Sequence, residues 1–310
     1  MKIKNNPILF AYLGIAFVVV FWGVVPTFKK MLIGDSYSAS VYTAVTAFSA
    51  AFALLAISAK HLRSVDRAYF AVAVPTGACL GVASLLQALA YNFDASPTNQ
   101  AFLENLSCIA VPIILFIAIR KRPTVLTVSA CILCMLSSIV LAGIFNVGLN
   151  FKTADILNGA AGIIYGVNIA VSGMYAKRFV ASVYVMIQHF VYAIMSVIMA
   201  VVLNFLYIGG APVDAFAFNP TPLLILALVG IGVFSSALCW TVRTHSMKYV
   251  SPSAVAVIMP LSAVVTGVVA IMLGQDEPSF TLLIGAVIGL VAAIISGFDG
   301  VERKPKRIEK

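Results

Sequence analysis

Apolar runs recur from one end of the chain to the other, separated by short polar or Pro- and Gly-containing turns. Each run has about 20 residues, the length that an α-helix needs to cross roughly 30 Å of hydrocarbon. Ten such runs occupy nearly all of the 310 residues, so no soluble domain is expected. The predicted spans are 7–28, 38–59, 68–92, 97–119, 124–145, 155–176, 182–207, 221–245, 252–273 and 279–298.

The composition agrees with a chain that has the bilayer as its solvent. Only 10% of the residues are charged and 62% are hydrophobic, with a mean hydropathy of +1.05, whereas roughly a quarter of the residues of a soluble domain are charged. A backbone inside hydrocarbon must satisfy its own hydrogen bonds, so runs of this length predict helices rather than barrel strands. The predicted fold class is an all-α integral membrane protein with ten transmembrane helices.

The basic residues indicate orientation rather than a nucleic-acid partner, although the net charge is +9. With the N-terminus inside, 16 of the 20 Lys and Arg residues fall on the cytoplasmic side, and only Lys29, Lys30 and Lys152 fall opposite. The positive-inside rule then places both termini in the cytoplasm, which requires an even number of spans. The basic N-terminus precedes a long apolar run without a cleavage pattern, so it predicts a retained first helix. We expect a multi-pass protein of the cell (inner) membrane.

An internal repeat appears when the sequence is shifted by 155 residues. The matched pairs are Gly77 with Gly232, Ser96 with Ser251, Pro97 with Pro252, Leu106-Ser107 with Leu261-Ser262, and Pro123 with Pro278. The opening helices align less well, with Trp22-Gly23-Val24 against Tyr165-Gly166-Val167 at a shift of 143. Each half holds five predicted spans, an odd number, so the second half would enter the membrane in the opposite direction, as in transporters with inverted repeats. The expected units are 1–146 and 147–300, followed by a basic cytoplasmic tail, 301–310.

Several short motifs fit one family. They are Phe21-Trp22-Gly23, Ala95-Ser96-Pro97 leading into Asn105-Leu106-Ser107, and Val250-Ser251-Pro252 leading into Met259-Pro260-Leu261. Together with ten spans in two halves, the chain resembles the drug/metabolite transporter (DMT) superfamily, EamA type. The resemblance implies two five-helix EamA repeats around a central cavity, no cofactor, and transport of small metabolites by proton coupling or exchange.

The sequence departs from the family at two places. The fourth helix of each repeat often ends in Leu-Gly-Glu in this family, whereas here the second repeat has Leu273-Gly274-Gln275 and the first has Ala118-Ile119-Arg120. Many members also carry a small or apolar residue where this chain has Glu104 within the fourth predicted span. This acid therefore points to a particular substrate class.

Charged groups are costly in the bilayer core, so those within spans are expected to face a cavity. Glu104 and Gln100 lie on one helical face, where the acid would bind an ammonium group or cycle a proton, or else form a structural bond between helices. Arg243, on one face with Trp240, would bind a carboxylate or else snorkel to the cytoplasmic interface. Direct pairing of Arg243 with Glu104 is not expected, since a separation of about 15 Å follows from the helical rise.

Other polar and aromatic residues share faces with these groups. Trp22 in the first span and Tyr165 and Asn168 in the sixth are expected to line the cavity or to form bonds between helices. Gln87 and Tyr91 share a face of the third span, and His189 in the seventh is a candidate proton relay or a structural histidine. The predicted substrate-binding residues are Glu104, Gln100, Trp22, Gln87, Tyr91, Tyr165, Asn168, Trp240 and Arg243, and the predicted proton-coupling residues are Glu104 and His189.

The leading prediction is a secondary transporter for a small amino acid or amine-bearing metabolite. A channel and an intramembrane enzyme are the alternatives. Neither a nucleophile motif nor a metal motif of the HExxH type is present, and Cys131 and Cys134 lie mid-span without a second ligand pair, so neither catalysis nor a metal is expected. The expected partners are a small-molecule substrate and the lipid bilayer, and assembly as a homodimer is left open.

Overall fold

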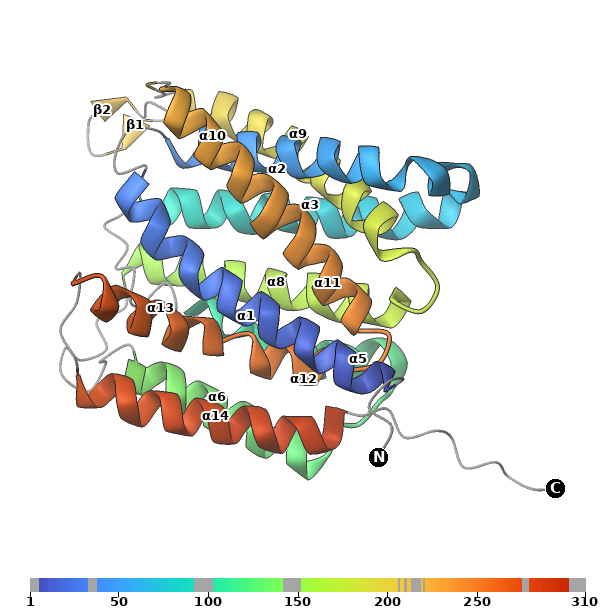
Figure 1. Cartoon of the computed structure of the whole chain (residues 1–310), viewed down its shortest axis with the longest axis vertical. Coiled ribbons are helices and arrows are strands. Elements are labelled where there is room, and N and C mark those ends of the chain that lie inside the picture. Colours follow the sequence, from blue (N-terminus) through green and yellow to red (C-terminus); the bar gives the residue numbers. More distant parts are fainter. Residues whose placement is uncertain are drawn as a thin grey trace.

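A computed structural model describes residues 6–32, 38–91, 103–141, 152–205, 207–208, 211–212, 219, 221–274 and 279–300. Its helices lie side by side in one bundle (Figure 1). In chain order the elements are α1 (Pro7–Leu32), α2 (Ala39–Ser58), η2 (Ala59–Ser64), α3 (Arg67–Tyr91), α5 (Ser107–Ile119), α6 (Val125–Leu141), α8 (Thr153–Tyr175), α9 (Ala181–Asn204), β1 (Tyr207–Ile208), β2 (Ala211–Pro212), α10 (Pro222–Ile231), η3 (Gly232–Leu238), α11 (Cys239–Ser246), α12 (Pro252–Ile258), α13 (Leu261–Met272) and α14 (Phe280–Gly300).

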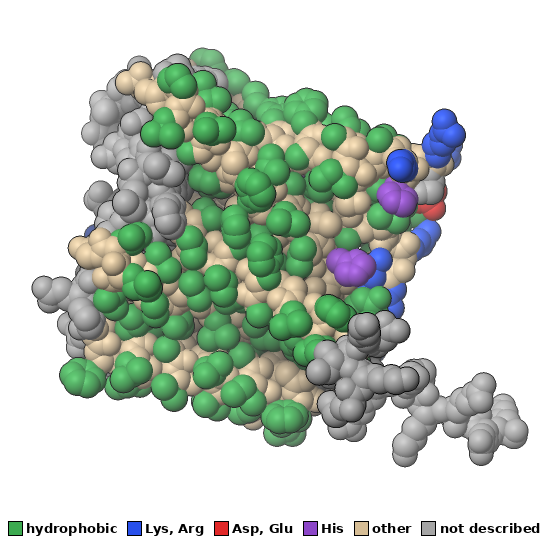
Figure 2. Space-filling model, in the orientation of Figure 1, with side chains coloured by type: hydrophobic (Ala, Val, Ile, Leu, Met, Phe, Trp, Pro, Cys, Tyr) green, Lys and Arg blue, Asp and Glu red, His purple; other side chains and the backbone are tan. Residues whose placement is uncertain are grey.

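The helices confirm an all-α membrane protein, with a two-residue antiparallel hairpin, β1–β2, as the only sheet among the described residues. Within that part of the chain, eight helical segments are long and apolar enough to cross a membrane, and α5 and α6 are shorter apolar helices. Each predicted span overlaps one of these ten segments, and the fourth and fifth predicted spans overlap the two shorter ones. Hydrophobic side chains cover the visible flank of the bundle (Figure 2).

Two predicted spans contain a break in the α-helix. In the ninth, α12 ends at Ile258 and α13 begins at Leu261, because Pro260 cannot donate a backbone hydrogen bond to the turn before it. In the fourth, a helical turn at Leu103–Glu104 is separated from α5 by Asn105–Leu106. The two breaks are 154 residues apart, within one residue of the 155-residue shift.

The eighth predicted span is also not a uniform α-helix. It begins as α10, winds as a π-helix through η3, and ends as α11. A π-turn closes its hydrogen bonds over five residues rather than four, and such segments are frequent at functional sites.

The helix starts follow the repeat register. Arg67 opens α3 and Pro222 opens α10, while Val125 opens α6 and Phe280 opens α14, so both pairs are 155 residues apart. The predicted boundary between residues 146 and 147, and the tail 301–310, lie outside the described residues.

Glycines at repeat-related positions contact repeat-related partners. A Cβ added to Gly23 of α1 would meet Ser262 and Val265 of α13, and one added to Gly166 of α8 would meet Ser107 and Ala110 of α5. The partners themselves are 155 residues apart. The two halves therefore place helices in close contact through the same positions, where only a missing side chain permits the approach.

A second glycine pair behaves alike. Gly77 of α3 lies against Gln188 and Val191 of α9, and Gly232 of η3 lies against Thr46 and Ser49 of α2. The partners again differ by a constant shift, here 142 residues. Helices α6 and α14 pack together on one side of the bundle and α2 with α9 on the other, so α1, α3, α8 and α11 occupy the middle (Figure 1).

Lys and Arg side chains gather at one end of the helices (Figure 2). This end carries the turn after α2, the turn between α8 and α9, and the end of α11. The N-terminal part of α1 joins the C-terminal part of α14 through the Tyr12 hydroxyl, which donates to the Gly297 carbonyl at 3.1 Å. The start of the first helix and the end of the last thus lie on the same side of the bundle.

Candidate functional site

The guanidinium of Arg243 lies inside the bundle, where α11 faces α8. Its side chain is 3% exposed, and Nη2 donates a hydrogen bond to Asn168 Oδ1 at 3.1 Å. The snorkelling alternative is therefore wrong, because Asn168 supplies an acceptor within the bundle and the neighbouring indole stacks on the cation. The guanidinium carbon lies 3.9 Å from the centre of the Trp240 ring, a favourable cation–π distance.

Trp22 of α1 joins the cluster of Arg243, Asn168 and Trp240, which we call the cationic group, and connects it to the π-helix. Its ring centre lies 5.7 Å from that of Trp240 and 5.8 Å from the guanidinium carbon of Arg243. The indole Nε1–H donates to the Ser235 carbonyl at 3.1 Å. Side chains from the first and eighth predicted spans thus form one aromatic enclosure around the cation.

Asn168 extends the cationic group to α3. Its Nδ2 donates to the Thr76 carbonyl at 3.0 Å. The Thr76 hydroxyl in turn lies 2.8 Å from the Tyr184 hydroxyl and accepts a hydrogen bond from Gln188 Nε2 at 2.8 Å. Four segments, α3, α8, α9 and α11, therefore meet in one buried polar network, which holds Asn168 in place to orient Arg243.

A second polar group surrounds Glu104. Gln87 Nε2 of α3 donates to Glu104 Oε1 at 3.1 Å, and the Tyr165 hydroxyl of α8 donates to Gln87 Oε1 at 3.3 Å. The Ser84 hydroxyl lies 3.5 Å from that of Tyr165 and donates to Tyr192 of α9 at 3.0 Å. The carboxylate therefore ends a hydrogen-bonded chain that crosses three helices.

The two charged groups border neighbouring parts of α8. Tyr165, beside the acid, and Asn168, beside the cation, are three residues apart on one helical face. Tyr165 lies within electrostatic range of both Glu104 and Arg243, yet no ion pair joins the two charges. The side chains of Trp22, Trp240 and Glu104 are partly exposed in the described structure.

His189 lies between the two groups. Its ring is 5.6 Å from that of Trp240 and 6.2 Å from that of Tyr192, both edge-on. Nδ1 lies 2.9 Å from the Val185 carbonyl, an acceptor that requires the proton on Nδ1. The ring is 1% exposed, so its structural bond to the preceding turn is present and a relay role stays a prediction.

Seven of the predicted substrate-binding residues converge in this interior. They are Glu104, Trp22, Gln87, Tyr165, Asn168, Trp240 and Arg243. Gln100 and the side chain of Tyr91 lie outside the described residues. Sequence reasoning missed Thr76, which continues the face of Ser84 and Gln87 two turns toward the start of α3, so extending that face would have found it.

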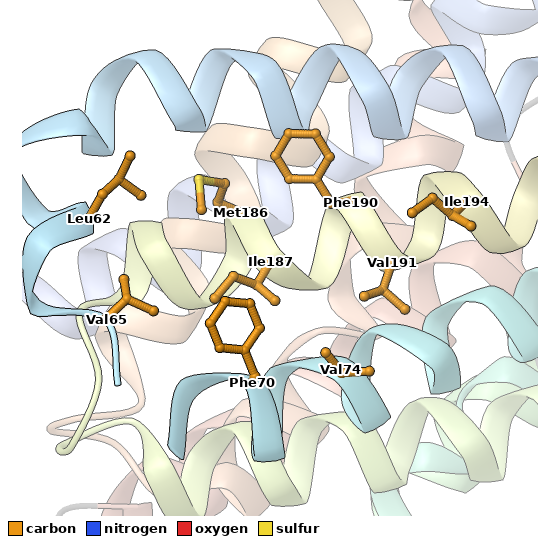
Figure 3. Close-up of a pocket in the computed structure, with 9 residues that line it drawn as sticks. All are labelled: Leu62, Val65, Phe70, Val74, Met186, Ile187, Phe190, Val191 and Ile194. Atoms are coloured by element: carbon orange, nitrogen blue, oxygen red, sulfur yellow. The ribbon is translucent and has the colours of Figure 1, made fainter. Parts of the chain in front are cut away.

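A groove lies elsewhere, between η2, α3 and α9, with a volume of about 510 Å³ (Figure 3). Its lining is wholly apolar: Leu62, Val65, Phe70, Val74, Met186, Ile187, Phe190, Val191 and Ile194. Phe190 follows His189 directly, so the groove and the polar interior lie on different faces of α9. Without a polar group the groove cannot orient a polar metabolite.

Residues 157–298 match the EamA-like transporter family. The matched region makes up a little under half of the chain, and over it the chain is similar to EamA-like transporters. The match runs from within α8 to within α14. A solved structure titled only "Crystal structure of protein" superposes with a TM-score of 0.75, covering 92% of this chain and 96% of its own, at 16% identity. At that identity the likeness shows the fold alone. No curated protein matches the chain in sequence.

The match to residues 157–298 agrees with the resemblance inferred from the motifs at the helix breaks and in the first span. Together with the long apolar helices of the described residues, it indicates a multi-pass membrane transporter of the DMT type. These polar contacts join helices of both halves of the chain: α1 and α3 from the first, and α8, α9 and α11 from the second.

Proposed function

We propose that the protein is a secondary active transporter that moves a small polar metabolite bearing an amine, by alternating access. The observation that carries the proposal is that a carboxylate, Glu104, and a guanidinium, Arg243, lie beside neighbouring turns of α8 without pairing with each other. Intramembrane charges are expensive, so unpaired ones are most simply explained by a polar ligand between them. Glu104 would receive the ammonium group, and the indoles and Tyr165 would enclose the rest.

The repeat supports alternating access. Glycines and partners at repeat-related positions pack alike, and the matched helix starts suggest two halves of opposite membrane direction. Such halves can exchange conformations, which exposes a site between them to each side in turn. We therefore propose an inverted repeat, with both termini in the cytoplasm of the cell membrane. Coupling is to a proton carried by Glu104 or His189, or is exchange with a second metabolite.

The experiment is counterflow with the full chain reconstituted in liposomes. Vesicles loaded with an unlabelled mixture of amino acids, amines, nucleosides and vitamins are diluted into the labelled mixture, and uptake is measured by mass spectrometry. Saturable exchange of an amine-bearing compound supports the proposal. Unsaturable flux of small ions would favour a channel, chemical conversion of a compound would favour an enzyme, and either result would overturn it.

The role of Glu104 is tested by Glu104→Gln, which removes the charge and leaves the shape. We expect affinity for the amine-bearing substrate to fall about tenfold or more, because one charge-assisted hydrogen bond is lost. Asp66→Asn is the matched control, since Asp66 is an exposed acid at the end of the bundle. Wild-type affinity together with wild-type pH dependence in Glu104→Gln would remove the acid from both binding and coupling.

Proton coupling has its own readout. His189→Gln keeps the size and one amide donor in place of the ring. If His189 carries the coupled proton, accumulation driven by a pH gradient stops while counterflow continues. If both persist unchanged, the histidine is a structural residue bonded to Val185.

A further inference from the structure

The Arg243 guanidinium is short of partners for a buried cation. One of its nitrogens, Nη2, donates to Asn168, while Nε is buried and forms no hydrogen bond within the described part of the chain. In that part of the chain, no carboxylate lies within ion-pair distance of Arg243 either. A buried charged donor without an acceptor costs free energy.

The surroundings do not supply the missing anion. The Trp240 and Trp22 rings offer cation–π contacts, which compensate part of the lost hydration but accept no hydrogen bond in the plane of the guanidinium. Asn168 is neutral and is already engaged with Thr76. Arg presents a planar fork of donors that matches the two oxygens of a carboxylate.

From these contacts we infer that the substrate carries a carboxylate, which binds at Arg243, and that the transported compound is a zwitterionic amino acid rather than a simple amine. The inference rests on the proposed function and decides between the two substrate classes that it leaves open. The carboxylate then binds at Arg243, beside Asn168 of α8, and Tyr165 lies one turn away on the same helix.

The enclosure of Nε agrees with this assignment. In the described conformation the Trp22 and Trp240 rings and the Asn168 amide cover the guanidinium, so a carboxylate reaches Nε only when these groups move apart. Trp22 comes from α1 and Trp240 from α11, and a shift of one helix against the other opens the contact. Binding of the anion satisfies the buried donor and thereby favours the conformation that admits it.

The test uses the wild-type chain in liposomes and an equimolar mixture of the 20 common L-amino acids with mass-spectrometric detection. For the amino acid exchanged best, competition is compared among the acid itself, its primary amide and the amine that lacks the carboxyl group. We expect the acid to compete about tenfold to a hundredfold better than either analogue, since hydrogen bonds to a charged group are lost in both. No variant is needed for this comparison, so a failure to fold cannot obscure it.

Arg243→Gln then tests whether Arg243 causes the preference for the acid over the amine. We expect the advantage of the acid over the amine to disappear, whereas a purely structural role would weaken both compounds alike. Arg243→Lys keeps the charge without the fork and should retain part of the preference. Arg178→Gln is the matched control, because Arg178 is exposed at the end of the bundle and pairs with Asp66.

The outcomes separate this inference from the proposed function. Exchange of amines or amides as good as that of the acids overturns the carboxylate site and leaves the transporter of amines standing. Absence of exchange for every amino acid, amide and amine overturns both. A preference for the acid that survives in Arg243→Gln assigns the carboxylate to another residue and overturns the inference.

Discussion

Helix α3 and the segment α10–η3–α11 are repeat-related, and they differ in a useful way. Both run for the same length in the same register, from Arg67 to Tyr91 and from Pro222 to Ser246. Each approaches a neighbouring helix through a glycine. Gly77 of α3 lies against α9, and Gly232 of η3 lies against α2. Yet α3 is α-helical throughout and carries neutral polar groups, whereas its counterpart contains a π-helix and carries the cation. The two segments therefore share their packing positions but differ in helical winding and in the polar groups that they carry.

The largest expected effect tests the shared packing. Gly77→Leu and Gly232→Leu should each destabilise the fold by at least about 1–3 kcal/mol, because a side chain would collide with the backbone of the neighbouring helix. The measurement is thermal unfolding of purified protein in detergent, with the monodisperse yield as a second readout. Gly230→Leu is the control, since its Cβ would meet nothing within 4 Å. Equal losses of stability in all three variants would contradict a shared packing role for Gly77 and Gly232.

The next effect tests the link between the two segments. Asn168 joins the Thr76 carbonyl of α3 to Arg243 of α11, so Asn168→Leu removes both hydrogen bonds and leaves the Arg243 guanidinium without its acceptor. We expect a loss of about 2 kcal/mol or more in stability. Asn168→Asp should lose less, because it offers Arg243 an acceptor.

The aspartate variant also sharpens the proposed carboxylate site. An acid placed beside the guanidinium competes with the substrate carboxylate, so the concentration of amino acid for half-maximal exchange should rise about tenfold. The measurement is counterflow across a concentration series. Unchanged affinity would show that Arg243 does not meet the substrate.

A smaller effect tests the difference in winding. Trp22 donates to the Ser235 carbonyl of η3, while its repeat counterpart Tyr165 donates to a side chain of α3. Trp22→Phe should cost about 0.5–1.5 kcal/mol and speed hydrogen exchange in residues 232–238. Tyr165→Phe should cost a similar amount without affecting that segment. Faster exchange there in both variants would contradict a specific hold on the π-helix.

The smallest expected effect comes from an exposed ion pair at the end of the bundle, away from the buried contacts compared above. Arg178 and Asp66 form an ion pair with a 3.8 Å separation, and their side chains are 58% and 60% exposed. Such pairs contribute about 0–1 kcal/mol because water screens them. Arg178→Gln should therefore leave unfolding and transport within error of wild type. A larger loss in the unfolding measurement would mean that the turn between α8 and α9 matters more than its exposure suggests.

The fold followed from the sequence where a single physical rule dominates. Hydrocarbon thickness set the spans, and the starts of α3, α6 and α10 lie within one residue of the predicted ones. Pro260 signals the break in the ninth span, but Asn105 and Leu106 carry no such signal in the fourth. Nothing in residues 232–238 distinguishes a π-helix from an α-helix, and the Trp22 hydrogen bond to Ser235 comes from a helix that is distant in the sequence.

The sequence predicted which residues belong to the site better than it predicted their contacts. Polar residues at membrane depth are few, so counting them found Glu104, Arg243 and Asn168 before any contact was known. Whether Arg243 points to the interface or to the interior depends on tertiary partners, and a helical wheel cannot supply them. Thr76 was missed because a threonine can satisfy its hydroxyl within its own helix, here with the Val72 carbonyl, and so needs no cavity.

The π-helix allows the residues that follow it in α11 to rotate about the helix axis if its winding changes. A π-turn holds about one residue more than an α-turn, and one residue of an α-helix corresponds to about 100° of rotation. Rewinding η3 as an α-helix would turn Trp240 and Arg243 about the helix axis by roughly that angle. Release of the Trp22 bond to Ser235 would unlock this rotation, and hydrogen exchange in residues 232–238 would record it.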